Sequence, residues 1–244
     1  MAEVLAEAAL EAGVVSVEAE EGSGAAAPRG AGETMNAEKY FTTEEKEKIR
    51  QAVILAEQRT SGEIVPLIVG SSDDYLEVEI GGLITGSVIG TAAAFMLGDP
   101  WAPAHSLLTW PLLGSGLGFI LCRVPALKRR LISNKRVAEA VELRSLAAFT
   151  AHGLHYTEAH SGILIFASLF ERRVIVLADR GINEKVPAGT WDEVVQTLTS
   201  GLKSGDGCAA FCQAIERCGE ILAAHFPRQS DDRDELGNKL ITEE

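Results

Sequence analysis

The sequence has few aromatic residues and few cysteines, and it lacks the motifs that would assign a reaction. Aromatic side chains make up 6% of the 244 residues, and no basic patch with interleaved aromatics is present, so we expect no nucleic acid partner. There is no nucleophile elbow, P-loop, HExxH helix or dinucleotide-binding glycine motif. The 4 cysteines form no CxxC pair, which favours small buried side chains in a reducing compartment over a metal site: Cys122, Cys208, Cys212 and Cys218.

The formal net charge of −13 is concentrated at the two ends of the chain. Residues 1–38 contain eight acidic residues and one basic residue, which gives −7, and residues 228–244 contain six acidic and three basic residues, which gives −3. Both segments are predicted to be disordered tails. Residues 1–38 lack a basic stretch followed by an apolar run, so we expect no secretory signal, and Met35 is a second candidate for the start of the chain.

Two long uncharged apolar runs lie in the first half of the chain. Ile80–Leu97 contains 18 residues and Ser106–Cys122 contains 17, and a turn-rich loop at 98–105 separates them. A bilayer core requires about 20 apolar residues per helix. The pattern therefore predicts a transmembrane hairpin over 78–125. Two buried helices of a soluble protein are the alternative, but such helices normally carry a polar stripe, and these do not.

Glycines recur every four residues in both runs, at 82, 86 and 90 and again at 114 and 118. Small residues at this spacing allow helix backbones to approach closely in lipid. The glycines are equally compatible with packing within the hairpin and with a homo-oligomer formed through it.

Basic residues predict the orientation of the hairpin, because the segment after the second run is rich in them and the loop at 98–105 has none. We expect this loop outside the cell, with the rest of the chain, both termini included, in the cytoplasm. The same basic residues are expected to contact anionic lipid headgroups: Lys128, Arg129, Arg130, Lys135 and Arg136.

The segments on either side of the hairpin carry alternating helix and strand patterns. In 39–72, Thr42 and Glu45 form a capping box that opens a helix, and a strand follows at 63–69, with Pro66 typical of an edge. In 134–227 we predict a helix over 134–151, a β-hairpin of apolar strands at 163–169 and 174–178, and two further helices, the first opened by Thr190 and Glu193. The first segment is too small to build a core alone. The two segments therefore form one α/β domain that the hairpin interrupts.

Acidic residues are the candidates for a cation site. Asp73 and Asp74, with Glu77 and Glu79, form the densest acidic cluster, and several carboxylates close together suit Ca²⁺ or Mg²⁺. A solvated loop is the other interpretation. Asp179 follows a predicted strand, where it is either part of a crevice or a capping residue.

Four stretches of the chain resemble the TPM domain family. They are Thr60-Ser61-Gly62-Glu63-Ile64-Val65, Ser161-Gly162-Ile163-Leu164-Ile165, Arg172-Arg173-Val174 through Asp179-Arg180-Gly181-Ile182, and Leu202-Lys203-Ser204-Gly205-Asp206. The resemblance implies an α/β/α sandwich around a small sheet. A hairpin inserted after the first strand is similar to a bacterial membrane subgroup of the family, which implies a multi-pass protein of the cytoplasmic membrane.

The resemblance implies little about chemistry, because relatives include assembly and quality-control factors as well as acid phosphatases. We expect a membrane-anchored factor that binds other membrane proteins and is not an enzyme, with Glu63, Arg180 and Gly181 at its binding edge. The alternative is a weak metal-dependent acid phosphatase, with Ca²⁺ or Mg²⁺ held by Asp73, Asp74 and Asp179.

Overall fold

In a computed structural model of the chain, residues 13–16, 36–97, 103–157, 160–187, 189–228 and 236–243 are described. The chain divides into two compact units, residues 1–72 with 139–244 and residues 73–138. Most of the two predicted tails and residues 98–102 of the predicted loop lie outside the described residues.

Within the described residues, the first unit is built on a five-stranded sheet in the order β1-β4-β3-β2-β5. β2 (Glu63–Val69) and β3 (Gly162–Ser168) run parallel at its centre, and every residue in both strands is buried. β4 (Arg173–Ala178) returns antiparallel to β3, which confirms the predicted β-hairpin. Because both faces of the central strands are covered, these strands appear in the sequence as continuous apolar runs.

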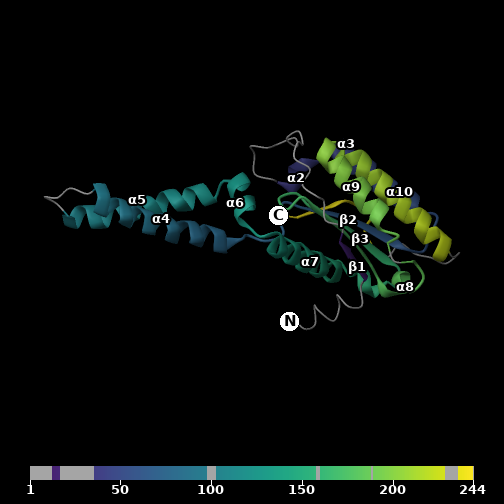
Figure 1. The fold of residues 1–244 in the computed structure, drawn as a ribbon. Coiled ribbons are helices and arrows are strands. Elements are labelled where there is room, and N and C mark those ends of the chain that lie inside the picture. Colours follow the sequence, from purple (N-terminus) through teal and green to yellow (C-terminus); the bar gives the residue numbers. More distant parts are fainter. Residues whose placement is uncertain are drawn as a thin grey trace. The chain divides into compact units, whose positions relative to one another are not determined.

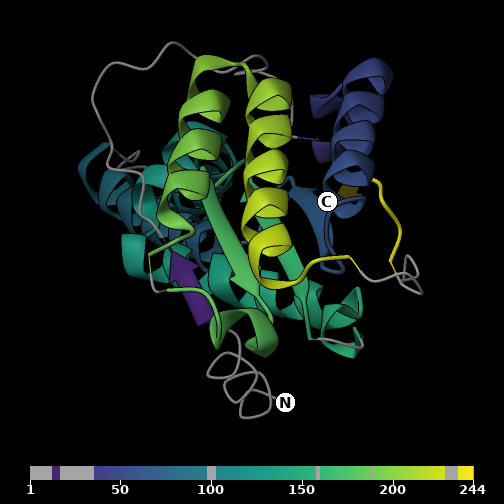
Figure 2. The same ribbon diagram turned by 90° about the vertical axis from the view of Figure 1, so that its right-hand side faces the viewer.

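Helices cover both faces of this sheet, which confirms the predicted α/β/α sandwich (Figure 1; Figure 2). One face carries α3 (Thr43–Glu57), α9 (Asp192–Ser204) and α10 (Gly207–His225), and the other carries residues 139–151 of α7 (Asn134–Ala151). The core between the sheet and the three helices contains Val53, Ile64, Ile165, Phe211 and Leu222. The described part of the unit also contains three short helices: α2 (Ala37–Tyr40), η1 (Leu154–Tyr156) and α8 (Arg180–Asn183).

Two strands lie in segments for which the sequence predicts disorder, so that prediction is wrong at both places. β1 (Gly13–Ser16) pairs antiparallel with β4, and β5 (Ile241–Glu243) pairs parallel with Leu67–Val69 of β2. The Glu243 carboxylate is held by Arg144 Nη2 at 2.8 Å and lies 3.1 Å from His152 Nε2. These distant partners fix a three-residue strand that its own composition does not predict. Pro66, which the sequence marks as typical of an edge, lies one residue before Leu67, where the pairing of β2 with β5 begins.

The two predicted capping boxes have different outcomes. Thr42 caps α3 and forms the full box with Glu45, as predicted. The box at Thr190 and Glu193 does not form, because the Thr190 hydroxyl donates to the carbonyl of Pro187 and the N-cap position belongs to Trp191. Trp191 is itself part of the core, with 2% of its surface exposed.

The second unit is a helical hairpin followed by a short helix. α4 (Leu76–Leu97) and α5 (Pro103–Cys122) extend the two apolar runs by a few residues at their N-terminal ends, and α6 (Pro125–Leu131) follows α5. Both long helices meet the length and composition that a membrane span requires.

The glycines of the two runs face one another across the hairpin. A Cβ at Gly86 would overlap the carbonyl oxygen of Gly114, and a Cβ at Gly118 would overlap that of Gly82. A Cβ at Gly90 would likewise meet the carbonyl of Trp110. Of the two possibilities that the spacing leaves open, these glycines serve packing within the hairpin. A homo-oligomer stays a prediction, and it would have to use other surfaces of the helices.

Candidate functional site

The structure brings Glu63 and Asp179 to the same end of the sheet. β2 and β3 begin there and β4 ends there, so Glu63 pairs with Gly162, and the Asp179 N–H donates to the carbonyl of Gly162 at 2.9 Å. The two acidic residues flank one position of β3, which places their Cα atoms roughly 10 Å apart at the usual strand spacing. Leu154 packs against Gly162, the position between the two acidic residues. A Cβ at Gly162 would lie 2.7 Å from the carbonyl oxygen of Leu154.

Asp179 has the capping role that was one of its two predicted roles. Its carboxylate accepts a hydrogen bond from the Arg180 N–H at 2.7 Å and caps α8, and its Oδ2 lies 3.3 Å from His160 Nδ1. The predicted edge residue Arg180 points to solvent and pairs with Glu184 at 2.9 Å, and Gly181 lies within α8.

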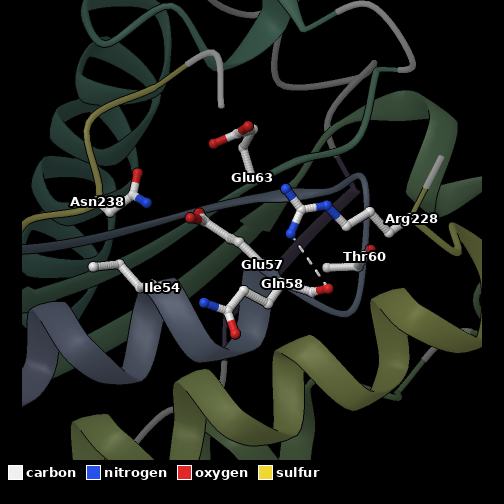
Figure 3. A pocket seen from close by; sticks show the side chains of 7 residues that line it. All are labelled: Ile54, Glu57, Gln58, Thr60, Glu63, Arg228 and Asn238. Atoms are coloured by element: carbon white, nitrogen blue, oxygen red, sulfur yellow. Dashed lines mark hydrogen bonds between the residues drawn. The ribbon is translucent and has the colours of Figure 1, made fainter. Parts of the chain in front are cut away.

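Glu63 lines a polar pocket of about 200 Å³ (Figure 3). The pocket forms where α3 ends and the chain turns into β2, a connection that places the side chains of Glu57 and Glu63 at one point. Glu63 is 7% exposed, and Glu57 accepts a hydrogen bond from the Ile64 N–H at 2.9 Å. The remaining lining residues are Ile54, Gln58, Thr60, Arg228 and Asn238.

Hydrogen bonds to the segment that follows α10 hold the wall of the pocket. The buried Thr60 hydroxyl donates to the carbonyl of Phe226 at 2.6 Å and accepts from the Gly62 N–H at 3.0 Å. Arg228 Nη1 lies 3.5 Å from the carbonyl of Gln58. The pocket thus combines two carboxylates with one guanidinium, an arrangement suited to a group that carries positive charge and hydrogen-bond donors.

Sequence reasoning named Glu63 but not its partners in the pocket. Glu57 is one of several acidic residues of an amphipathic helix, and Arg228 and Asn238 lie in a segment predicted to be disordered. Only the fold brings them together: hydrogen bonds from Thr60 and Ser61 to Phe226 place the segment with Arg228, and the pairing of β5 with β2 places the segment with Asn238.

In the second unit, three of the four carboxylates of the predicted acidic cluster form ion pairs with the chain's own basic residues at the base of the hairpin. Arg136 binds Asp73 at 2.5 Å and Glu77 at 3.1 Å. Lys128 binds the Glu79 carboxylate at 2.9 Å and the backbone carbonyl of Asp74 at 2.5 Å. Arg123 lies 3.5 Å from Glu79. Two of the predicted lipid-contacting residues, Lys128 and Arg136, are therefore engaged in ion pairs.

The ion pair with Arg136 lowers the pKa of the Asp73 carboxyl. Partial burial raises the pKa of its carboxyl, but hydrogen bonds from Arg136 and from the backbone N–H of Tyr75 outweigh burial, so the pKa lies below its usual range. Among the residues that the structure describes, no three His, Cys, Asp or Glu side chains form a group that could hold a metal ion. A Ca²⁺ or Mg²⁺ site at Asp73, Asp74 and Asp179 stays a prediction.

The comparisons with known proteins agree with this fold. Residues 130–221 match the family model of the TPM domain, which confirms the resemblance seen in the sequence. A search of curated protein sequences gave no match. The chain is similar to the NMR structure of the BA42 protein from the psychrophilic bacterium Bizionia argentinensis, with a TM-score of 0.54 and 21% sequence identity over 84% of this chain and 97% of that one. At this identity the likeness concerns the fold alone.

Proposed function

Since residues 130–221 carry a TPM domain, we propose that this chain is a membrane-anchored TPM protein that binds other membrane proteins. In this proposal α4 and α5 cross the cytoplasmic membrane of a bacterium. The connection at 98–105 lies outside, and the α/β unit, with both ends of the chain, lies in the cytoplasm.

The surface of the hairpin carries the proposal. A core helix of a soluble protein is buried, whereas the apolar side chains of α4 and α5 are mostly exposed, with Val88 and Ile89 each 64% exposed and Leu113 69% exposed. Apolar surface on this scale is covered by lipid or by other proteins. By length and composition, both helices are candidate membrane spans.

Polar side chains within the hairpin also suit lipid. Thr91 donates to the carbonyl of Ser87 at 2.9 Å, Thr109 to that of His105 at 2.8 Å, and Ser115 to that of Leu112 at 2.9 Å. Each hydroxyl is thus satisfied by its own helix, which is what a non-aqueous environment requires.

The polar pocket supports the interaction role. We propose that Glu57 and Glu63 receive a basic side chain of the partner, because two carboxylates face one guanidinium in that pocket. No sequence motif for a reaction accompanies it, so binding is the role that these residues support.

A photo-cross-linking residue placed at Gln58, on the wall of the pocket, tests this role in intact cells. We expect a membrane protein to be captured at Gln58 but not at the exposed Glu216 of α10, and we expect capture to fall in a Glu63→Gln variant. Equal capture at both positions, or capture that survives Glu63→Gln, would reject the pocket as the binding site.

A further inference from the structure

The outer edge of β4 is covered by a strand from a distant part of the chain. β1 pairs antiparallel with β4 over four residues, from Gly13 opposite Ala178 to Ser16 opposite Ile175, and Figure 2 shows it at the margin of the sheet. Nineteen residues separate Ser16 from Asn36, the N-cap of α2, and nine of them are alanine or glycine. A long connector therefore joins β1 to the helices of the unit.

The place of β4 in the sheet does not depend on β1. All six residues of β4 pair with β3 on the inner side, and α9 packs against the strand. Val174 and Val176 of β4 share the core with Val195 and Leu198 of α9. When β1 leaves, β4 therefore stays, and the N–H and C=O groups on its outer edge become a template for another strand.

The residues of β4 along this edge determine which strands can pair there. Ile175, Val176, Leu177 and Ala178, the four residues opposite β1, are all apolar and at most 3% exposed. A strand beside them continues a sheet whose two faces both carry helices, so it must have consecutive uncharged residues rather than an alternating pattern. The Gly-Val-Val-Ser sequence of β1 meets this requirement. An extended apolar segment of another protein meets it equally.

We propose that the outer edge of β4 binds extended apolar segments of partner proteins, and that β1 occupies this edge in their absence. The partner adds an antiparallel strand, so that backbone hydrogen bonds supply affinity and the apolar positions supply selectivity. β1 competes as a tethered ligand at an effective concentration in the millimolar range, because the entropic cost of closing a loop grows only slowly with its length. The inference goes beyond the proposed function, since β3 separates this edge from β2 and the pocket at Glu63.

Peptide binding to the detergent-solubilised full chain tests the inference. The probe is a fluorescent peptide with the sequence of residues 11–18, EAGVVSVE, and its binding is measured by anisotropy. The full-chain variant Val14→Pro/Val15→Pro releases β1, because N–H groups alternate in direction along a strand and two adjacent prolines remove one that points toward β4. We expect this variant to bind the peptide at least about tenfold more tightly than the wild-type chain, since the tethered strand no longer competes.

Matched controls locate the binding and define what the edge accepts. In the protein, Ala25→Pro/Ala26→Pro places the two prolines outside β1 and should bind the peptide like the wild-type chain. In the peptide, Val14→Ile/Val15→Ile should keep binding, whereas Val14→Asp/Val15→Asp should abolish it. Amide hydrogen exchange over 175–178 should be faster in the Val14→Pro/Val15→Pro variant and should return to the wild-type rate when the peptide saturates it.

The Val14→Pro/Val15→Pro variant should melt within a few degrees of the wild-type chain, because β4 stays paired with β3. Loss of its cooperative melt would make β1 a structural strand and overturn the inference, as would equal binding of the peptide by variant and wild type. A wild-type dimer that the same variant converts to monomers would instead assign the edge to β1 of a second copy. Capture at Gln58 tests the proposed function separately, because Gln58 lines the pocket.

Discussion

The buried carboxylate of Glu171 holds the segment after β2 against the turn between β3 and β4. It accepts hydrogen bonds from the Ser72 N–H at 2.9 Å, from the Ser71 hydroxyl at 3.2 Å and from the hydroxyl of Ser168. In the sequence Glu171 is one of three adjacent charged residues, and nothing in its neighbours marks it as the buried one. Ser71 and Ser72 lie about 100 residues earlier in the chain, so only the fold identifies this role of Glu171.

Glu171→Ala should destabilise the chain by about 2–3 kcal/mol, because two or more donors lose a buried charged acceptor. Glu171→Gln should cost less, since the amide oxygen still accepts. Thermal melts of the detergent-solubilised protein measure both changes, with Glu216→Ala on the exposed face of α10 as the control. Equal melting temperatures for Glu171→Ala and the control would show that the carboxylate does not hold these loops together.

Asp73→Asn should lower stability by roughly 0.5–1 kcal/mol near neutral pH, a modest value because the Asp73–Arg136 pair is partly exposed. The pKa of Asp73 is lower in the folded chain than in the unfolded one. Its contribution to stability is therefore present above its unfolded pKa and is lost as the pH falls through the folded pKa. Melts of both chains across acidic pH should converge as the pH falls, and a difference that stays constant over the acidic range would refute the assignment.

At the scale of elements, α4 and α5 depend on glycine for their close approach. Gly86→Leu should separate the helices and cost about 1–3 kcal/mol, as overpacking does in a well-packed interface. Gly116→Leu is the matched control, because a Cβ at Gly116 meets nothing within 4 Å. The measurement is the thermal stability of each variant in the same detergent, and an equal loss in the two variants would show that the glycines do not pack this hairpin.

Elements with strong internal signals could be predicted, and elements held by distant partners could not. The central strands and the two helices of the hairpin follow from uninterrupted apolar runs, and the start of α3 follows from the Thr42 capping box. β5 could not be predicted, because three residues carry no periodicity and Glu243 finds Arg144 about 100 residues away. The start of α9 was misplaced by one residue, because the Thr190 hydroxyl donates to the carbonyl of Pro187 and Trp191 is the N-cap residue.

At the scale of the whole molecule, the fold class could be predicted and the site only in part. Alternating helix and strand patterns on both sides of the hairpin indicate one interrupted α/β domain. Glu63 was named from the family resemblance, whereas the pocket also needs Glu57 at the end of α3 and Arg228 after α10. The acidic cluster around Asp73 illustrates the opposite error. Its density in the sequence suggested a cation site, whereas Lys128 and Arg136 form ion pairs with three of its four carboxylates.

The alternative function, a metal-dependent acid phosphatase, is also tested on the whole molecule. We expect millimolar Ca²⁺, Mg²⁺ or Mn²⁺ to shift the melting temperature by less than about one degree. Only an ion that binds the folded chain stabilises that chain, and an ion at Asp73 would have to displace Arg136. A rise of several degrees that Asp73→Ala or Asp179→Ala abolishes would establish an ion site and favour the phosphatase.

The central claim is that the hairpin crosses the membrane, and the accessibility of single cysteines tests it most directly. The four native cysteines are first replaced by alanine. In this background, Ala102→Cys marks the loop and Lys48→Cys marks the α/β unit. A membrane-impermeant maleimide is then applied to intact bacterial cells and to inside-out vesicles. The account predicts that Ala102→Cys reacts only in intact cells and Lys48→Cys only in the vesicles. Reaction of both cysteines from the same side would contradict it.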